Sequence, residues 1–181
     1  NSIAMLTALS NGNIRQMIEL TKTILTSAHL DTRKIVRYIK DTGSYSVPDF
    51  EGVKTLLFGD YDQYDPRASI FVNVFDIFHT DQKEHFIRIL LLDYLNRADT
   101  SGDASGYVPE SESMNYISTY YFDPITSRKH LAVLLKDDCV KFDDQSASTR
   151  RFKITTRGRY HAGGLLKTFQ YVDAVIIDTP I

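Results

Sequence analysis

The chain has little of what marks secreted or membrane-spanning proteins. Its 181 residues include a single cysteine, Cys139, which excludes an internal disulfide and suits a reducing compartment. A membrane-spanning helix needs about 18 or more apolar residues, and the longest apolar stretch here, residues 87–92, is interrupted by Arg88. Residues 1–10 lack a charged segment followed by an apolar one, so we expect no signal peptide and a cytoplasmic location.

The motifs of common catalytic and metal sites are also missing. No Gly-Lys pair occurs, so the phosphate-binding loop Gly-x-x-x-x-Gly-Lys-Ser/Thr is absent and we expect no ATP hydrolysis by this chain. The five histidines lack metal-ligand spacing, and Asp60, Asp62 and Asp65 do not follow the pattern of a calcium-binding loop. Cys139 has no identifiable base partner and suits a buried position. The sequence therefore predicts a non-enzymatic protein with no cofactor and no metal.

Charge is present but unevenly distributed. The net charge is −2, with 43% apolar and 24% charged residues, which is ordinary for a globular protein. Residues 124–161 hold nine Lys and Arg against four acids, a net +5, whereas the rest of the chain carries −7. Such an asymmetry would turn the basic part toward a polyanion. The alternative is that these charges are only a solvated surface.

The N-terminal part, residues 1–79, is predicted to be helical. A first helix is expected to start at Ser10 or Asn11 and to end near Ser27, from apolar residues at helical spacing. Asp31 and Gly43 have the positions of an N-cap and a C-terminal stop for a second helix. A third apolar helix should end before Gly59, and residues 70–78 fit either a buried strand or an irregular connection. A degenerate unit of helix, strand and helix is an alternative for part of this segment.

The C-terminal part, residues 80–181, alternates helical and strand-like patterns. Its first helix covers residues 84–96, and the side chains expected in its core face are Phe86, Ile89, Leu90, Leu92 and Leu95. A small strand, residues 107–109, is followed by helices at residues 110–121 and 125–136. Then come a strand at residues 139–142, a polar turn at 143–149, a strand at 151–155, a helix from Thr156 to about Phe169, and a tail that docks on the body. The fold class is mainly α with small β (α+β), and the order resembles a winged helix-turn-helix domain.

That order predicts where DNA would bind. In helix-turn-helix proteins the recognition helix enters the major groove with its N-terminal residues at the base edges. The corresponding residues here are Thr126, Ser127, Arg128, Lys129 and His130. Arg128 can pair with guanine through two hydrogen bonds. On the wing, Arg150 and Arg151 can reach phosphate or the minor groove, and Lys153 is a further expected DNA contact. We therefore predict double-stranded DNA as the partner. The alternative is a protein–protein interaction or autoregulatory module, in which these basic residues are incidental.

Two motifs carry a more specific resemblance. Residues 152–160, Phe-Lys-Ile-Thr-Thr-Arg-Gly-Arg-Tyr, resemble the second wing strand and following helix of winged-helix proteins, where Thr156 caps the helix and Gly158 permits close packing. Gly12-Asn13-Ile14-Arg15 resembles the Gly-x-x-Arg that starts the lid helix of AAA+ ATPases, including the origin-recognition type. The whole chain is similar to the lid and winged-helix region at the C-terminus of bacterial AAA+ or STAND-type P-loop ATPases.

The resemblance implies a non-catalytic C-terminal arm of a larger ATPase. In the full-length protein Arg15 would reach the terminal phosphate of ATP bound to the preceding domain. Any ATPase activity would belong to that domain, which is the expected partner in cis. The chain begins with Asn rather than Met, which fits a fragment of a longer protein, although processing or numbering explains it equally well.

Overall fold

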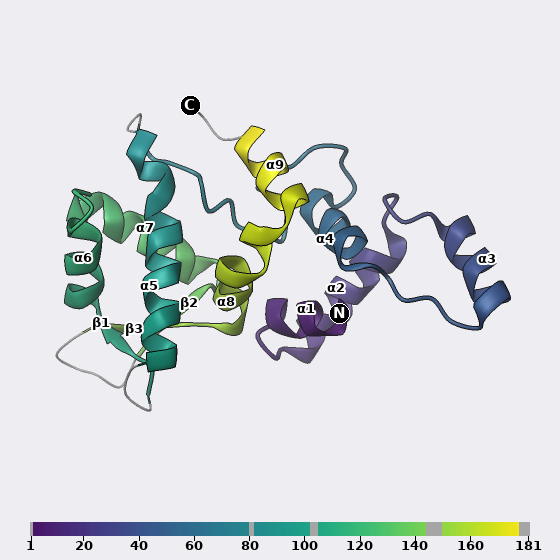
Figure 1. Ribbon diagram of the computed structural model, residues 1–181, viewed down its shortest axis with the longest axis horizontal. Coiled ribbons are helices and arrows are strands. Elements are labelled where there is room, and N and C mark those ends of the chain that lie inside the picture. Colours follow the sequence, from purple (N-terminus) through teal and green to yellow (C-terminus); the bar gives the residue numbers. More distant parts are fainter. Residues whose placement is uncertain (1, 80–81, 102–104, 144–149, 178–181) are drawn as a thin grey trace.

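The computed structural model describes residues 2–79, 82–101, 105–143 and 150–177. Helices predominate, and within these ranges short strands form one small antiparallel sheet (Figure 1). The chain is therefore α+β, as predicted. Within the described ranges, none of the helices combines the length and apolar character needed to span a bilayer.

The N-terminal part folds as α1 (Ser2–Leu9), α2 (Ile14–Thr26), α3 (Thr32–Thr42) and α4 (Asp49–Phe58). The sequence analysis missed α1 and placed the start of α2 too early. Asn11 and Gly12 have positive φ angles of 47° and 80°, which separates the two helices. The N-cap of α2 is Asn13, whose side chain accepts a hydrogen bond from the N–H of Gln16.

Helix α3 has the predicted ends but an uncovered surface. The Asp31 side chain accepts a hydrogen bond from the N–H of Lys34, and Gly43 ends the helix with a φ of 82°. The helix lies apart from the remainder of the molecule (Figure 1), and none of its residues is buried. Its apolar face, which includes Val36 and Ile39, is therefore left open to solvent.

The C-terminal part begins with the 3₁₀ segment η1 (Gln82–Phe86), followed by α5 (Ile87–Ser101), β1 (Val108–Pro109), α6 (Glu110–Ser118) and α7 (Pro124–Lys136). Strands β2 (Val140–Phe142) and β3 (Arg151–Ile154) come next, then α8 (Thr156–Gly163), η2 (Leu165–Lys167) and α9 (Phe169–Ile177). Strand β3 lies between β1 and β2 and runs antiparallel to both. The predicted order of helices and strands is confirmed, and residues 144–149 of the predicted turn lie outside the described residues.

Three details differ from the sequence predictions. Phe86 was expected in the core but is 55% exposed, because it belongs to a 3₁₀ segment with a different periodicity from the helix that follows. The cap of α8 is Thr155 rather than Thr156, since the Thr155 hydroxyl accepts the hydrogen bond from the N–H of Gly158. The predicted long final helix is divided into α8, η2 and α9 after Gly163.

One hydrophobic core runs through both parts of the chain. Helix α1 packs against α8 and α4 packs against α9, so the core crosses the division at residue 79 used in the sequence analysis. The predicted docking of the tail is confirmed as far as it is described, because Tyr171 and Val175 of α9 are fully buried. Gly158 marks a close contact, since a Cβ atom there would lie 2.0 Å from the Cys139 carbonyl oxygen.

Residues 70–78 form an irregular connection through the interior rather than a strand. The Tyr171 hydroxyl accepts a hydrogen bond from the N–H of Val74 at 3.2 Å and donates to the carbonyl of Val72. The N–H of Val72 donates to Nε2 of His161 at 3.3 Å. Side chains from α8 and α9 thus satisfy backbone groups that a strand partner would otherwise satisfy.

Candidate nucleic-acid interface

Helix α7 begins where local chemistry favours a helix start. The carboxylate of Asp123 accepts a hydrogen bond from the N–H of Thr126 at 2.8 Å, and Pro124 occupies the first helical position. This hydrogen bond also lowers the pKa of Asp123. The exposed residues of α7 are Pro124, Ile125, Arg128, Lys129, Ala132 and Lys136. The helix therefore presents three basic side chains to solvent, among them two of the predicted DNA contacts.

Two other predicted contacts are wrong. Ser127 and His130 are fully buried, together with Leu131 and Leu134, because these positions form the stripe of α7 that faces the core. The Ser127 hydroxyl donates to the Asp123 carbonyl at 2.8 Å. Neither Ser127 nor His130 can touch a nucleic acid while α7 stays packed. Thr126 is half-buried.

Arg128 is accessible but already has a partner. Its side chain is 54% exposed, and its Nε donates to Oε1 of Glu110 at 2.7 Å. Glu110 is the first residue of α6, so this ion pair links the two helices of the expected DNA-binding motif. An exposed ion pair contributes at most about 1 kcal/mol, and a phosphate or guanine can compete for the guanidinium. Lys129, the next residue, is exposed.

The sheet gathers cations around one aromatic ring. Strand β3 alternates, with Phe152 and Ile154 buried and the side chains of Arg151 and Lys153 on the other face. The charged groups of Arg151, Lys153 and Lys141 each lie 5.9 Å from the centroid of the Tyr107 ring. We call these four residues the Tyr107 cluster. It concentrates three positive charges on one small patch of the sheet.

Hydrogen bonds hold two of these cations in place. Arg151 donates through Nη2 to the Tyr107 carbonyl at 3.0 Å, and Lys153 donates through Nζ to the Ser105 carbonyl at 2.8 Å. Nζ of Lys153 also lies 3.0 Å from Oδ1 of Asp99, whose other oxygen pairs with Arg159. One carboxylate is therefore shared between two cations. Arg150, another predicted contact, is exposed at the start of β3.

Tyr107 and Lys141 were missed by the sequence analysis. Lys141 lies directly opposite Lys153 in the β2–β3 ladder, and this register is set by strand pairing rather than by any local motif. Two like charges directly opposite one another destabilise a sheet. An anion bound at the Tyr107 cluster would relieve this repulsion, which makes the cluster suited to phosphate.

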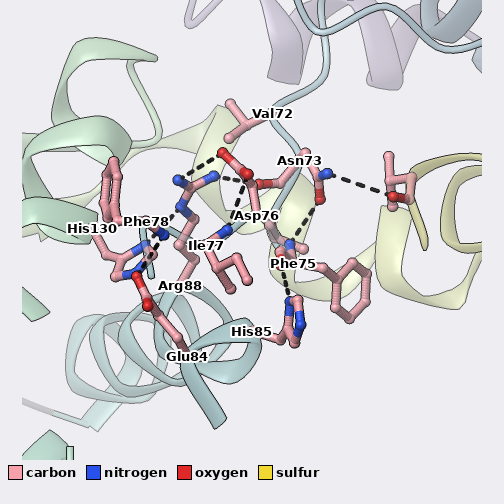
Figure 2. A network of polar contacts seen from close by, with 12 residues as sticks. Val72, Asn73, Phe75, Asp76, Ile77, Phe78, Glu84, His85, Arg88 and His130 are labelled. Atoms are coloured by element: carbon pink, nitrogen blue, oxygen red, sulfur yellow. Dashed lines mark hydrogen bonds and ion pairs between the residues drawn. The ribbon is translucent and has the colours of Figure 1, made fainter. Parts of the chain in front are cut away.

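A buried polar network fixes α7 to the residues before it (Figure 2). Glu84 accepts hydrogen bonds from the N–H groups of Phe78 and His79 at 2.7 and 3.0 Å, and from Nε2 of His130 at 2.8 Å. Arg88 donates through Nε to Nδ1 of His130 at 3.0 Å. The His130 ring thus donates from one nitrogen and accepts at the other, which is the neutral form.

Arg88 extends the network to the irregular connection. Its terminal nitrogens donate to the carbonyl of Asn73 and to Oδ2 of Asp76, the latter at 3.2 Å. Arg88 and Glu84 are both buried, and each is hydrogen-bonded (Figure 2). Helix α7 is therefore held by charged and neutral partners from η1, α5 and residues 73–79.

Burial and hydrogen bonds set the ionisation of this network. Burial lowers the pKa of His130 to about 4, and the nearby Arg88 guanidinium acts in the same direction. Burial alone would raise the pKa of Glu84, but the hydrogen bonds from Phe78, His130 and His79 outweigh it and lower the pKa. At neutral pH the network therefore contains ionised Glu84, neutral His130 and charged Arg88.

Helix α2 carries a different kind of surface. Arg15 is exposed in its first turn, after the positive-φ residue Gly12. Ile14, Ile18 and Leu25 are exposed at 73%, 63% and 63%, and they follow one face of the helix. We call these three residues the α2 stripe. Apolar side chains at this spacing are typical of a surface that packs against another protein element.

Cys139 is buried, as predicted, and burial raises the pKa of its thiol to about 12. The thiol is therefore protonated at neutral pH and is a poor nucleophile. In the part of the chain that the structure describes, no three His, Cys, Asp or Glu side chains are grouped to hold a metal ion.

No family model matches the chain, and neither the curated proteins nor the solved structures contain a match to it. Its function is therefore inferred from its own residues.

Proposed function

We propose that residues 87–154 form a winged helix-turn-helix domain that binds double-stranded DNA, with α7 as the recognition helix. The observation that carries this proposal is the order α5, β1, α6, α7, β2, β3, with β3 in the middle of the sheet. Helices α6 and α7 are joined by residues 119–123, a short turn suited to a helix-turn-helix pair. In such a pair the second helix enters the major groove.

Two groups of cations would divide the contacts to DNA. Arg128 and Lys129 lie near the N-terminus of α7, the end that meets the base edges in helix-turn-helix docking. Lys141, Arg151 and Lys153 of the Tyr107 cluster would contact phosphate, which positions the protein without reading sequence. Affinity would then come largely from phosphate contacts and would depend on salt.

Fluorescence anisotropy of a labelled mixed-sequence duplex tests this proposal. Lys129→Ala and Lys141→Gln are expected to weaken binding, and Lys141→Gln, which removes a phosphate contact, should reduce the slope of log K against log salt by about 1. Lys40→Gln on the distant helix α3 is the matched control and should bind like the wild type (Figure 1). Equal losses in all three variants, or no loss in the first two, would contradict the assignment of these contacts.

A second candidate function is protein interaction, and the α2 stripe favours it. If the chain is the C-terminal arm of a P-loop ATPase, the stripe would pack on the preceding domain and Arg15 would reach its bound ATP. The same anisotropy assay separates the two functions. Ile18→Glu should leave DNA affinity unchanged, whereas a wild type that binds no duplex even at about 50 mM salt would favour protein interaction alone.

A further inference from the structure

Residues of α4, α9 and the loop after α4 line a groove. In Figure 1, α4 and α9 lie near the middle of the molecule and α6 lies at one end of it. The two helices pack against each other, and residues 62–64 also line the groove. Its volume is about 540 Å³, within the range of roughly 300–1,000 Å³ typical of small-molecule sites. The groove is thus large enough for a ligand and separate from the proposed DNA contacts.

Aromatic side chains form much of the groove lining. They are Phe50, Phe58, Tyr64 and Phe169, contributed by α4, the following loop and α9. Phe169 is 75% exposed and Phe50 is 52% exposed, so two rings at the groove are largely uncovered. Tyr64 is buried at the base of this lining, and its hydroxyl donates to the Phe71 carbonyl at 3.2 Å.

The charged lining is predominantly acidic. Asp62 comes from the loop and Asp173 from α9, whereas Lys54 of α4 is the one basic side chain in the lining. Among the described residues, neither carboxylate forms an ion pair or a side-chain hydrogen bond. Within the part of the chain that the structure describes, the groove therefore combines aromatic side chains with two solvent-exposed carboxylates that have no cationic partner.

We propose that the α4–α9 groove binds a small organic cation with an apolar body, such as an aryl- or alkylammonium compound. The negative faces of aromatic rings attract cations, and Asp62 and Asp173 supply the complementary charge. The apolar body would cover Phe50 and Phe169. A neutral ligand would leave both carboxylates unpaired, and an anion would be repelled by them.

Isothermal titration calorimetry with benzyltrimethylammonium tests the proposal, with benzyl alcohol and benzenesulfonate as neutral and anionic aromatic probes. The ammonium compound is expected to bind, and the other two are expected to bind at least fivefold more weakly or not at all, which corresponds to about 1 kcal/mol from the cation. Failure of the ammonium compound to bind, or equal affinity for benzyl alcohol, would overturn the proposal.

Variants of the lining residues test whether the ammonium compound binds in this groove, and further variants test whether a loss of binding comes from misfolding. Phe169→Ala and the double variant Asp62→Asn/Asp173→Asn should each weaken binding several-fold. Phe86→Ala and Asp60→Asn change exposed residues outside the groove lining and serve as matched controls. Lys54→Gln should strengthen binding, a gain that a misfolded protein would not give. Unchanged affinity in both the Phe169 and the double carboxylate variants would overturn the assignment to this groove.

Discussion

Lys141 and Lys153 lie directly opposite each other in the β2–β3 ladder, and both ammonium groups lie 5.9 Å from the Tyr107 ring centroid. Of the two lysines, Lys153 alone has an ion pair among the described residues, with Asp99 at 3.0 Å, so part of the repulsion between them persists in the unbound protein. A site that binds phosphate benefits from such an arrangement, because the bound anion removes the repulsion. Replacing one of the two lysines is therefore expected to raise the stability of the fold and to lower the affinity for DNA.

The variant Lys141→Gln tests whether stability and DNA affinity change in opposite directions. We expect the variant to be more stable by roughly 0.2–0.5 kcal/mol, since a like-charge pair across the ladder is removed, and to bind duplex DNA more weakly. Urea unfolding and anisotropy on the same samples measure the two quantities. A variant that loses stability and keeps its DNA affinity would show that Lys141 has a purely structural role.

Glu110 is expected to compete with DNA for Arg128, because the two side chains form an ion pair with an N–O distance of 2.7 Å. Glu110→Gln should therefore raise DNA affinity a few-fold, while Arg128→Ala should lower it. In the double variant the gain from Glu110→Gln should disappear, which anisotropy can measure as a double-mutant cycle. A gain that persists without Arg128 would mean that Glu110 repels DNA directly.

Acid should destabilise the protein between about pH 6.5 and pH 4. The pKa values of His130 and His161 are lowered by burial to about 4, so in this window the unfolded chain binds protons that the folded chain does not. Stability therefore falls as pH falls, by up to roughly 3 kcal/mol for each histidine when the window is crossed. The lowered pKa of Glu84 adds a further loss only at still lower pH.

Urea unfolding at pH 7, 6 and 5 measures this dependence. His130→Gln should reduce the slope of stability against pH by about half, because His161 remains. A stability that is constant from pH 7 to pH 5 would refute the neutral, buried state assigned to both rings.

The network around Arg88 should matter more to stability than a surface ion pair. Arg88→Met removes the guanidinium donor from the buried His130 Nδ1 atom, the Asn73 carbonyl and Oδ2 of Asp76, with an expected loss of about 1–3 kcal/mol from the unsatisfied buried acceptor. Arg97→Met removes the exposed pair with Asp93 and should cost at most about 1 kcal/mol. Chemical denaturation measures the free energy of unfolding of the two variants. Equal losses of stability in both would contradict the structural role of the network.

Two glycines of α8 should respond oppositely to alanine. A Cβ at Gly158 would lie 2.0 Å from the Cys139 carbonyl oxygen, so Gly158→Ala is expected to destabilise the protein by about 1–3 kcal/mol or more. Nothing lies within 4 Å of a Cβ at Gly163, where alanine should stabilise the helix by about 0.4–1 kcal/mol. Thermal unfolding of both variants measures these changes in stability. A Gly158→Ala variant as stable as the wild type would contradict the close contact between Gly158 and the Cys139 carbonyl.

Local signals explain which parts of the fold were predictable. Asp31, Gly43, Asp123 and Pro124 mark helix ends through hydrogen bonds and backbone angles that depend on near neighbours, and the structure has helix ends at all four. Residues 70–78 gave no such signal, because their backbone partners are His161 and Tyr171, about ninety or more positions later.

The candidate site was only partly predictable for the same reason. Closeness to the N-terminus of α7 suggested Ser127 and His130 as contacts, but their helical phase matches that of Leu131 and Leu134 and places them in the core. The Tyr107 cluster depends on strand register, which the sequence does not reveal locally. Arg128 and Lys129 were correctly expected at the surface because the helix has charges on its outer face.

The most direct measurement is the affinity of the wild-type chain for a labelled mixed-sequence duplex as salt is raised from about 50 to about 200 mM. If the three cations of the Tyr107 cluster each contact a phosphate, affinity should fall roughly fortyfold over this range. No binding at the lowest salt, or an affinity that does not change with salt, would contradict DNA binding by this protein.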